Sequence, residues 1–367
     1  MTLTAQEKAR YSRHLLLPEI GERGQQQLRA ARVLIVGAGG LGSPAALYLA
    51  AAGVGHIGII DHDTVELSNL QRQVLFASDD VGQSKAELAR ARLLQLNPGI
   101  EVTAHAEELR AANAESVFAA YDVVLDGSDR LGTRYLVNDA CVLLGKSLVS
   151  AAIHRFEGQA MTYVPKQGPC YRCLFSDPAQ GGVPNCAEAG VLGVLPGVLG
   201  SIQATEAIKL VTGIGTPLIG RLLTYDALDM RFREFRFQRR ADCAVCGERP
   251  GITTLRDAPA ESDVDVPGLR PWSATELRDA LRNDVRTGRL VLVDVREPAE
   301  FALDHLEGSL NIPLADLPGR IAELAGRQPV FLCLSGVRSR EACAVASRHG
   351  ITTPGHLIGG LRDWPVA

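Results

Sequence analysis

A cysteine and an arginine bracket a short loop near the end of the chain, in the segment CLSGVRS. Cys333 begins this loop and Arg338 closes it, with four residues between them. The residues PVFLCL predict a buried strand before the loop, and SREACAVASRHG predicts a helix after it. Backbone N–H groups of such a loop, a helix N-terminus and an arginine can together hold an anion on a cysteine sulfur. The pattern therefore predicts thiolate chemistry at Cys333.

The length of this loop separates two kinds of cysteine chemistry. Related phosphatase folds place a longer Cys…Arg loop around a phosphate group. Four intervening residues make a smaller cradle, which suits a terminal sulfur atom. We therefore favour an anionic persulfide on Cys333, stabilised by the loop and by Arg338, over phosphate-ester hydrolysis.

A glycine-rich turn near the start of the chain indicates nucleotide binding. Gly37, Gly39 and Gly42 form G-x-G-x-x-G between the predicted strand RVLIVG and an Ala/Leu-rich helix. Glycines permit a tight turn, and the helix N-terminus attracts phosphate. Asp61 ends the next predicted strand, HIGIID, where a carboxylate can bind ribose hydroxyls. On these residues alone, an NAD-linked oxidoreductase is the usual interpretation.

Three further charged residues favour a nucleoside triphosphate instead. Arg72 and Lys85 are expected near the same crevice, and Asp129 is expected at the end of the fourth strand, YDVVLDGSD. Cations can neutralise the β and γ phosphate oxygens, and a carboxylate can bind Mg²⁺. A dinucleotide needs neither, so the sequence predicts ATP and Mg²⁺.

Four motifs place the first two thirds of the chain in a known family. VLIVGAGGLGSP, DxDTVELSNLQRQ, GQSKAE and GPCYRC, within residues 10–250, closely resemble the motifs of MoeB/ThiF-type adenylyltransferases, relatives of the ubiquitin-activating enzymes. The resemblance implies ATP-dependent adenylation of the C-terminal glycine carboxylate of a ubiquitin-like sulfur-carrier protein. It leaves open which carrier is served, and whether the pathway is molybdopterin, thiamine, tRNA thiolation, cysteine or siderophore synthesis.

The same resemblance assigns roles to individual residues. Gly40 would approach the nucleotide, Asp61 would bind ribose, Asp129 would bind Mg²⁺, and the phosphates would be held by Ser68, Asn69, Arg72 and Lys85. Arg13, in RYSRH, would reach into the site of a second subunit, because the family works as homodimers. Arg130 stands where the family usually has asparagine, so one nucleotide contact is expected to differ.

Two pairs of cysteines have the spacing of metal-binding turns. Cys170-x-x-Cys173 and Cys243-x-x-Cys246 each lie beside glycine or proline. Four thiolates in a tetrahedral array suit structural Zn²⁺, with a pair of redox dithiols as the alternative. The family resemblance agrees with zinc.

The remaining cysteines are single. A lone cysteine is usually a small buried residue, and we expect Cys141 and Cys343 to lie in the core. Cys186 instead lies in the irregular, Gly/Pro-rich segment PNCAEAG. The resemblance implies that Cys186 attacks the activated carrier or resolves a disulfide.

The last hundred residues resemble a rhodanese domain. LVDVREPAEFALDHLEGSLNIPL, CLSGVRS and LIGGLRDWP carry this likeness. It implies that Cys333 persulfide, loaded by a donor such as a cysteine desulfurase, delivers sulfur to the adenylated carrier and yields a thiocarboxylate. The segment 249–268, rich in Pro, Gly, Asp and Ser, is predicted to be a flexible linker that lets the Cys333 loop reach the adenylation site.

The expected architecture is α/β throughout. Alternating strand and helix signals predict a Rossmann-like adenylation domain over 1–248 with a mainly parallel sheet, ending in hairpins formed by GQAMTYV, RLLTYDAL and FREFRF. A smaller α/β domain is predicted over 269–367.

Composition excludes several other classes. The 367 residues are 46% hydrophobic and 22% charged, with a net charge of −4, so neither nucleic acid nor an anionic membrane is an expected partner. No signal peptide and no bilayer-spanning stretch are apparent, which predicts a cytoplasmic protein. A carrier-binding scaffold without adenylation activity remains an alternative.

Overall fold

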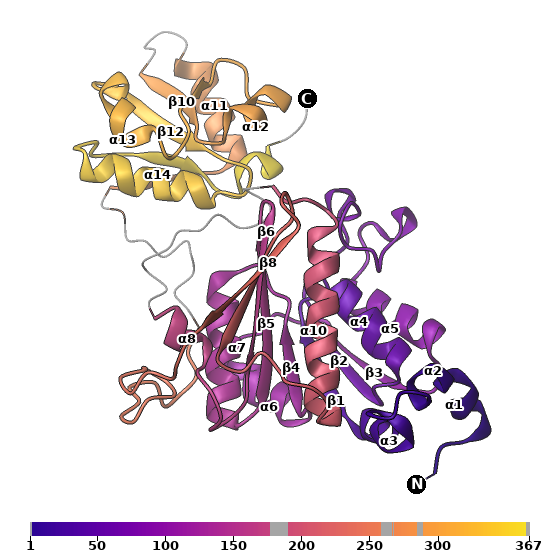
Figure 1. Cartoon of the computed structure of the whole chain (residues 1–367). Helices are drawn as coiled ribbons and strands as arrows, with labels where there is room; N and C mark the ends of the chain where they lie inside the picture. The colour runs from indigo at the N-terminus through magenta and orange to yellow at the C-terminus, as the bar shows by residue number, and fades with distance from the viewer. Residues whose placement is uncertain (1, 177–189, 258–265, 267, 285–288, 365–367) are drawn as a thin grey trace. The chain divides into compact units, whose positions relative to one another are not determined.

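The computed structural model describes residues 2–176, 190–257, 266, 268–284 and 289–364. The chain divides into two compact units, Met1–Ala258 and Pro259–Ala367. Each unit is built around its own sheet, and Figure 1 shows their elements.

The first unit combines one sheet with helices that lie before and between its strands in the chain. Its strands are β1 (Arg32–Val36), β2 (His56–Ile60), β3 (Glu101–His105), β4 (Val123–Asp126), β5 (Ser147–His154), β6 (Glu157–Tyr163), β7 (Arg221–Asp226) and β8 (Arg231–Arg236). Its helices are α1 (Ala5–Arg10), α2 (Ser12–Leu15), α3 (Gly21–Ala30), α4 (Gly42–Ala52), α5 (Lys85–Leu96), α6 (Ala111–Ala119), α7 (Leu131–Leu144), α8 (Tyr171–Leu174) and α10 (Leu195–Thr212), with 3-10 turns η1 (Leu67–Asn69) and η2 (Ser78–Asp80).

The sheet order is β3-β2-β1-β4-β5-β6-β7-β8. The first five strands in this order, β3, β2, β1, β4 and β5, are parallel to one another. The last three, β6, β7 and β8, join the sheet in antiparallel fashion. The predicted α/β class, the mainly parallel sheet and the later hairpins are therefore confirmed.

The buried strands explain the two layers of helices. In β1, Val33 and Ile35 pack in the core under α4, α5 and α10, and Leu34 and Val36 pack in the core under α6 and α7. Alternate side chains of a strand point to opposite faces, so a strand covered on both sides is apolar throughout. Figure 1 shows α10, α4 and α5 on one face of the sheet and α6 and α7 on the other.

Strand order also locates the crevice in which a ligand can bind. From β1 the chain proceeds to β2 and β3 on one side, and then returns to β4 on the other side of β1. In doubly wound sheets, ligands bind beyond the carboxyl ends of the strands at such a reversal. The loops after β1, β2 and β4 are therefore the candidates for such a site.

The second unit is a smaller, wholly parallel sheet in the order β11-β10-β12-β13-β9. Its elements are β9 (Arg270–Trp272), α11 (Ala274–Asp284), β10 (Leu290–Asp294), α12 (Pro298–Leu303), β11 (Leu310–Asn311), α13 (Leu317–Arg320), η4 (Ile321–Leu324), β12 (Gln328–Leu332), α14 (Val337–Arg348), β13 (Gly355–Leu357) and η5 (Gly360–Asp363). Here the order reverses between β10 and β12, which brings the loops after these two strands together.

The predicted linker, 249–268, contains the boundary between the units. Ile252 and Leu255 pack against the core of the first unit, and the Ile252 N–H donates to the Ala244 carbonyl at 2.9 Å. Val266 is buried in the core of the second unit. Within the described residues, no helix combines the length and the apolar character that crossing a membrane requires.

Candidate functional site

The glycine-rich turn closes so tightly that side chains would collide in it. Gly37 has φ +90°, and a Cβ there would lie 3.0 Å from the Gly127 carbonyl oxygen; one on Gly42 would lie 1.9 Å from the Gly37 oxygen. Beside this turn, Asp61 accepts a hydrogen bond from the Ala38 N–H at 2.8 Å. The turn, the start of α4 and the end of β2 thus lie close together, in an arrangement that can accommodate phosphate and ribose.

The turn after β2 supplies a second wall. The half-buried Arg72 donates to the Ser68 carbonyl at 3.0 Å, and its Cγ lies 3.5 Å from where a Gly40 Cβ would be. Asn69 is buried, and its side-chain oxygen accepts from the Glu66 N–H at 3.3 Å. Gly40, Ser68, Asn69 and Arg72 are therefore brought together.

Gln73 belongs to this wall, although motif reasoning did not select it. Its side chain is buried, and its amide nitrogen lies 3.6 Å from where a Gly39 Cβ would be. Within the described residues, its buried amide oxygen has no hydrogen-bond partner. A buried acceptor left without a donor costs free energy, so a ligand that donates here fits the cradle.

Lys85 begins α5 and lies almost completely buried beside the cradle. Its Nζ binds the Asp63 carboxylate at 3.0 Å. Burial opposes ionisation of Asp63, but the charge and hydrogen bond of Lys85 outweigh it and lower the pKa of this carboxyl. Burial dominates at Asp61 and raises its pKa, despite the charge of Lys85. Ligand atoms of Asp61, His62 and Asp63 lie within 4.8 Å of one another, so this end of β2 can also bind a cation.

Asp129 lies in the crevice loop, but further from the sheet than its predicted position. The strand β4 ends at Asp126, because the Asp126 carboxylate turns the chain by accepting from the N–H and hydroxyl of Ser128, at 3.1 and 2.6 Å. Asp129 is exposed in the loop that follows. Arg130 pairs with Glu108 at 3.1 Å, and its charge also acts on Asp63.

Arg13, which is predicted to act in the site of a second subunit, lies away from the crevice of its own chain. Arg13 is exposed in α2, and the nearby Tyr11 packs where a Gly53 Cβ would lie, at the C-terminal end of α4. The glycine turn lies at the other end of that helix. Cys186 lies outside the described residues.

The four paired cysteines meet at one point. Sulfur atoms are 4.0 Å apart in Cys170–Cys173, 3.6 Å in Cys170–Cys243 and 3.4 Å in Cys173–Cys246. A tetrahedral ion with bonds of about 2.3 Å to sulfur separates its ligands by about 3.8 Å. Hydrogen bonds with the other sulfurs, together with burial, raise the pKa of Cys170. Four thiolates therefore need a cation between them, and this donor set fits zinc.

Cys333 lies at the opening of a second cradle, between β12 and α14. Its sulfur is buried and accepts hydrogen bonds from the N–H groups of Gly336, at 3.1 Å, and Ser339, at 3.4 Å. Gly336 has φ +92°, and a Cβ there would lie 3.2 Å from the Gly359 nitrogen. Two backbone donors thus point at the sulfur, as expected for a site that stabilises a sulfur anion.

Arg338 closes this loop but is paired with an acidic residue. Its guanidinium binds Glu300 of α12 through two hydrogen bonds of 2.8 and 2.9 Å. Sequence reasoning did not select Glu300, although it lies in the quoted motif VDVREPAEF. Its partner is 38 residues away, and no local pattern predicts that contact.

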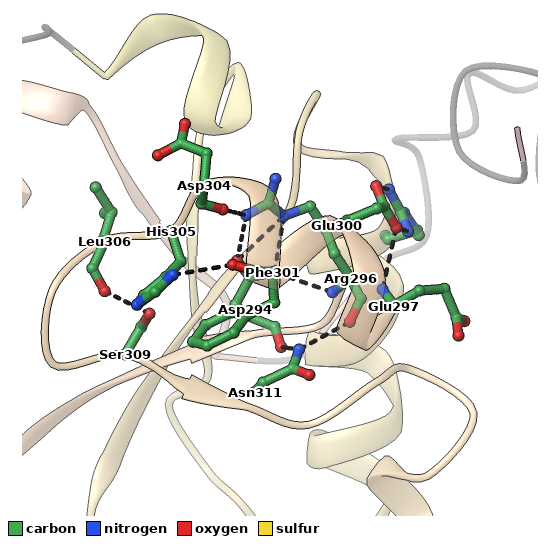
Figure 2. Close-up of polar contacts among 11 residues, drawn as sticks. Asp294, Arg296, Glu297, Glu300, Phe301, Asp304, His305, Leu306, Ser309 and Asn311 are labelled. Carbon is green, nitrogen blue, oxygen red and sulfur yellow. Dashed lines mark hydrogen bonds and ion pairs between the residues drawn. The ribbon is translucent and has the colours of Figure 1, made fainter.

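A buried ion pair holds the loop that carries α12. Figure 2 shows the Arg296 guanidinium between the Asp294 carboxylate, at 2.7 Å, and the Asp304 carbonyl, at 2.6 Å. The Asn311 amide donates to the carbonyls of Asp294 and Arg296, at 3.1 and 2.8 Å (Figure 2). These contacts fix the segment in which Glu300 lies.

The Glu300–Arg338 pair predicts a pH dependence. Burial opposes ionisation of Glu300, but Arg338 outweighs it and lowers the pKa of Glu300 below its usual 4.5. Because the folded-state pKa is the lower one, the pair stabilises the unit fully above pH 4.5 and progressively less as pH falls through the folded value. Glu300→Gln should therefore make the unfolding of this unit less sensitive to pH below 4.5.

Tryptophan fluorescence of the full chain can measure this, because both tryptophans, Trp272 and Trp364, lie in the second unit. Thermal midpoints would be compared across acidic pH for wild type and Glu300→Gln. Parallel curves would show that the ion pair makes no contribution.

Comparisons with known proteins find the same two parts. The ThiF family matches residues 11–245, and the rhodanese-like domain matches residues 273–366. The "Probable adenylyltransferase/sulfurtransferase MoeZ" of Mycobacterium tuberculosis is 45% identical over 373 residues, covering 99% of this chain and 94% of the relative. The "Adenylyltransferase and sulfurtransferase MOCS3" of Mus musculus is 48% identical over 396 residues, covering 99% of this chain and 86% of the relative.

Among solved structures, part of this chain resembles E. coli MccB. The structure of MccB with ATP aligns with a TM-score of 0.59 and 26% identity, covering 66% of this chain and 75% of that chain. A second MccB structure, with succinimide, gives the same TM-score and identity.

Proposed function

This chain belongs to the ThiF family and continues into a rhodanese-like domain, and we propose that it adenylates a ubiquitin-like sulfur carrier and then converts the adenylate to a thiocarboxylate. The observation that supports this most is the presence of two different cradles in one chain. One can hold a triphosphate beside Lys85, and the other directs backbone donors at the Cys333 sulfur.

The first step joins two anions, so positive charge decides its rate. The C-terminal glycine carboxylate of the carrier attacks the α-phosphorus of ATP, and pyrophosphate leaves. Lys85 and Arg72 would neutralise the phosphates, and Asp61 would hold the ribose. Asp129 would bind Mg²⁺, which supplies further neutralising charge when bound. The product is a mixed anhydride from which AMP leaves readily.

The second step is sulfur transfer. The terminal sulfur of Cys333 persulfide attacks the acyl carbon, AMP leaves, and an acyl disulfide joins carrier and enzyme. A thiolate then attacks the Cys333 sulfur, which releases the carrier thiocarboxylate and leaves an enzyme disulfide. We propose Cys186 as that thiol. A dithiol reductant then restores both cysteines, and a donor such as a cysteine desulfurase reloads Cys333.

We further propose an assembly and a location for the protein. The family resemblance implies a homodimer as the working unit, in which Arg13 would act in the site of a second copy. A cytoplasmic location fits the seven described cysteines, which form no disulfide with one another. No direct contact with nucleic acid or membrane is needed.

Zinc is proposed to hold the Cys170, Cys173, Cys243 and Cys246 cluster in a structural role. Cys246→Ser should lose the metal and lower the thermal midpoint of the first unit by more than about 10 °C, because structural zinc supplies much of the local folding free energy. Zinc analysis and calorimetry of the full chain would check this. Cys141→Ala, a buried non-ligand in the same core, should keep its zinc; equal zinc in both variants would contradict the assignment.

Thiocarboxylate formation on the carrier tests the proposal as a whole. The full chain would be incubated with carrier, ATP, Mg²⁺ and a persulfide source, and the carrier mass measured. We expect the carrier mass to rise by the difference between one sulfur and one oxygen atom, and only when ATP is present. Carrier that binds but stays unmodified would favour the scaffold alternative. The NAD-linked alternative, disfavoured by Arg72 and Lys85, would require NAD to bind more tightly than ATP.

A further inference from the structure

Ser339 places two polar groups beside the Cys333 sulfur, and only one of them belongs to the backbone. Its N–H donates to the sulfur at 3.4 Å, and its hydroxyl oxygen lies 3.6 Å from the same sulfur. Ser339 lies in the first turn of α14, and both residues are fully buried. Bulk water therefore does not compete for this hydroxyl.

The hydroxyl of Ser339 also has a backbone partner. It donates to the Gly336 carbonyl at 3.0 Å, and the Gly336 N–H donates to the Cys333 sulfur at 3.1 Å. A serine hydroxyl that returns to a carbonyl three residues earlier is a common local contact, and by itself it indicates no function. What distinguishes Ser339 is the reactive sulfur on its other side.

The two partners of this hydroxyl suit two states of the cysteine. A hydroxyl has one proton to donate and two lone pairs that accept. While Cys333 is a thiol, its S–H donates to the Ser339 oxygen, and the Ser339 proton stays on the Gly336 carbonyl. A thiolate can only accept, and rotation of the hydroxyl turns its proton to the sulfur without moving the oxygen. Hydrogen bonds to an ion are about twice as strong as those between neutral groups, so the thiolate favours this rotation.

The guanidinium groups nearest this cradle are paired with carboxylates. Glu300 of α12 binds Arg338 through two hydrogen bonds. Asp294, at the end of β10, binds Arg296 at 2.7 Å. Each cation therefore shares its charge with a carboxylate, and the neutral donors of the loop contribute a larger part of the stabilisation of a sulfur anion.

Two other elements beside the cradle carry titratable or charged groups. His356 lies on β13, and burial together with the charge of Arg340 lowers its pKa below the usual 6.5, so its ring is neutral above that pH. Arg362 and Asp363, on the turn η5, are exposed, and water screens their charges. All these groups are retained when Ser339 is replaced, so a substitution there isolates the hydroxyl.

We propose that Ser339 is a catalytic residue of sulfur transfer, whose hydroxyl turns to the Cys333 sulfur and stabilises the thiolate. The inference rests on the proposed function of this cradle. In persulfide loading, the Cys333 thiolate attacks the terminal sulfur of a donor persulfide. One S–S bond forms as another breaks, and the donor cysteine leaves as a thiolate, so no external oxidant or reductant is needed. The Ser339 hydroxyl keeps its proton throughout.

Ser339→Ala and Ser309→Ala form a matched pair. Ser309 also lies in the second unit, and its hydroxyl also donates to a carbonyl three residues earlier, that of Leu306, at 2.6 Å. The Cys333 thiolate of the full chain would be titrated by ultraviolet absorbance, as the difference between each variant and the same variant carrying Cys333→Ala. Ser339→Ala should raise the midpoint of this titration by about half to one pH unit, which is about a three- to tenfold change in the thiolate equilibrium. Ser309→Ala should leave the midpoint unchanged.

Amide hydrogen exchange separates this role from a merely structural one. If the Ser339 hydroxyl only braced the loop through the Gly336 carbonyl, Ser339→Ala would loosen residues 333–339 and speed their exchange. We expect exchange in this loop to stay at the wild-type rate. An unchanged titration midpoint in Ser339→Ala, an equal shift in Ser309→Ala, or a shift accompanied by faster exchange of the loop would overturn the inference.

Neither measurement uses carrier or ATP. A wild-type chain that forms no thiocarboxylate would therefore refute the proposed function, and the titration would still decide whether the Ser339 hydroxyl stabilises the thiolate.

Discussion

Cys333→Ser should lower the rate of thiocarboxylate formation by at least about a thousandfold. Carrier-dependent ATP–pyrophosphate exchange should stay at the wild-type level. Loss of a covalent nucleophile is among the largest single effects in enzymes. Serine fills the same buried space and can still meet the N–H groups of Gly336 and Ser339. It cannot, however, hold a persulfide.

Cys343→Ala is the matched control for this variant. Cys343 is equally buried in the same unit, where it donates to the Gly355 carbonyl. The Cys343→Ala variant should form thiocarboxylate at the wild-type rate, with at most a small loss of stability. If Cys333→Ser still forms thiocarboxylate, or if it also loses exchange activity, the division of labour between the two units is wrong.

Lys85→Met should lower the kcat/KM of carrier-dependent ATP–pyrophosphate exchange by about a hundred- to a thousandfold, the usual loss when one preorganised charge-stabilising group is removed. Methionine has a similar length and suits a buried position, so the fold should persist. The ion pair with Asp63 is lost, but Asp63 is half exposed and can be hydrated. Persulfide loading of Cys333, measured by mass spectrometry, should not change.

Arg90→Gln is a suitable comparison, because Arg90 lies on the same helix but is exposed and pairs only weakly with Glu87, at 3.5 Å. It should leave exchange within about twofold of wild type. If the exchange activity of Lys85→Met also lies within about twofold of wild type, Lys85 does not belong to the phosphate site.

The fold could be predicted from sequence where local patterns decide it. Continuous apolar runs such as RVLIVG specify strands buried on both faces, and the glycine spacing specifies the turn after β1. The paired cysteines specify a four-sulfur cluster because each pair can form a turn around one ion. The core positions of Cys141 and Cys343 are confirmed.

Contacts between distant residues were harder to predict. The pairing of Arg338 with Glu300 joins the start of α14 to α12 across the switch point of the second sheet, and the pairing of Arg134 with Asp126 depends on where β4 stops. Asp126 ends that strand through its own side chain, three residues before the predicted end at Asp129. Such contacts depend on three-dimensional packing, which a motif does not encode.

Carrier-dependent ATP–pyrophosphate exchange tests the central claim most directly, because it requires both the adenylation cradle and the correct carrier. The wild-type chain would be assayed against every Gly-Gly-ended ubiquitin-like carrier of its source organism, with carriers lacking the last glycine as controls. Exchange that depends on one intact carrier is predicted. Binding of carrier and ATP without exchange by any member of that set would contradict adenylation, and would leave the chain a carrier-binding scaffold.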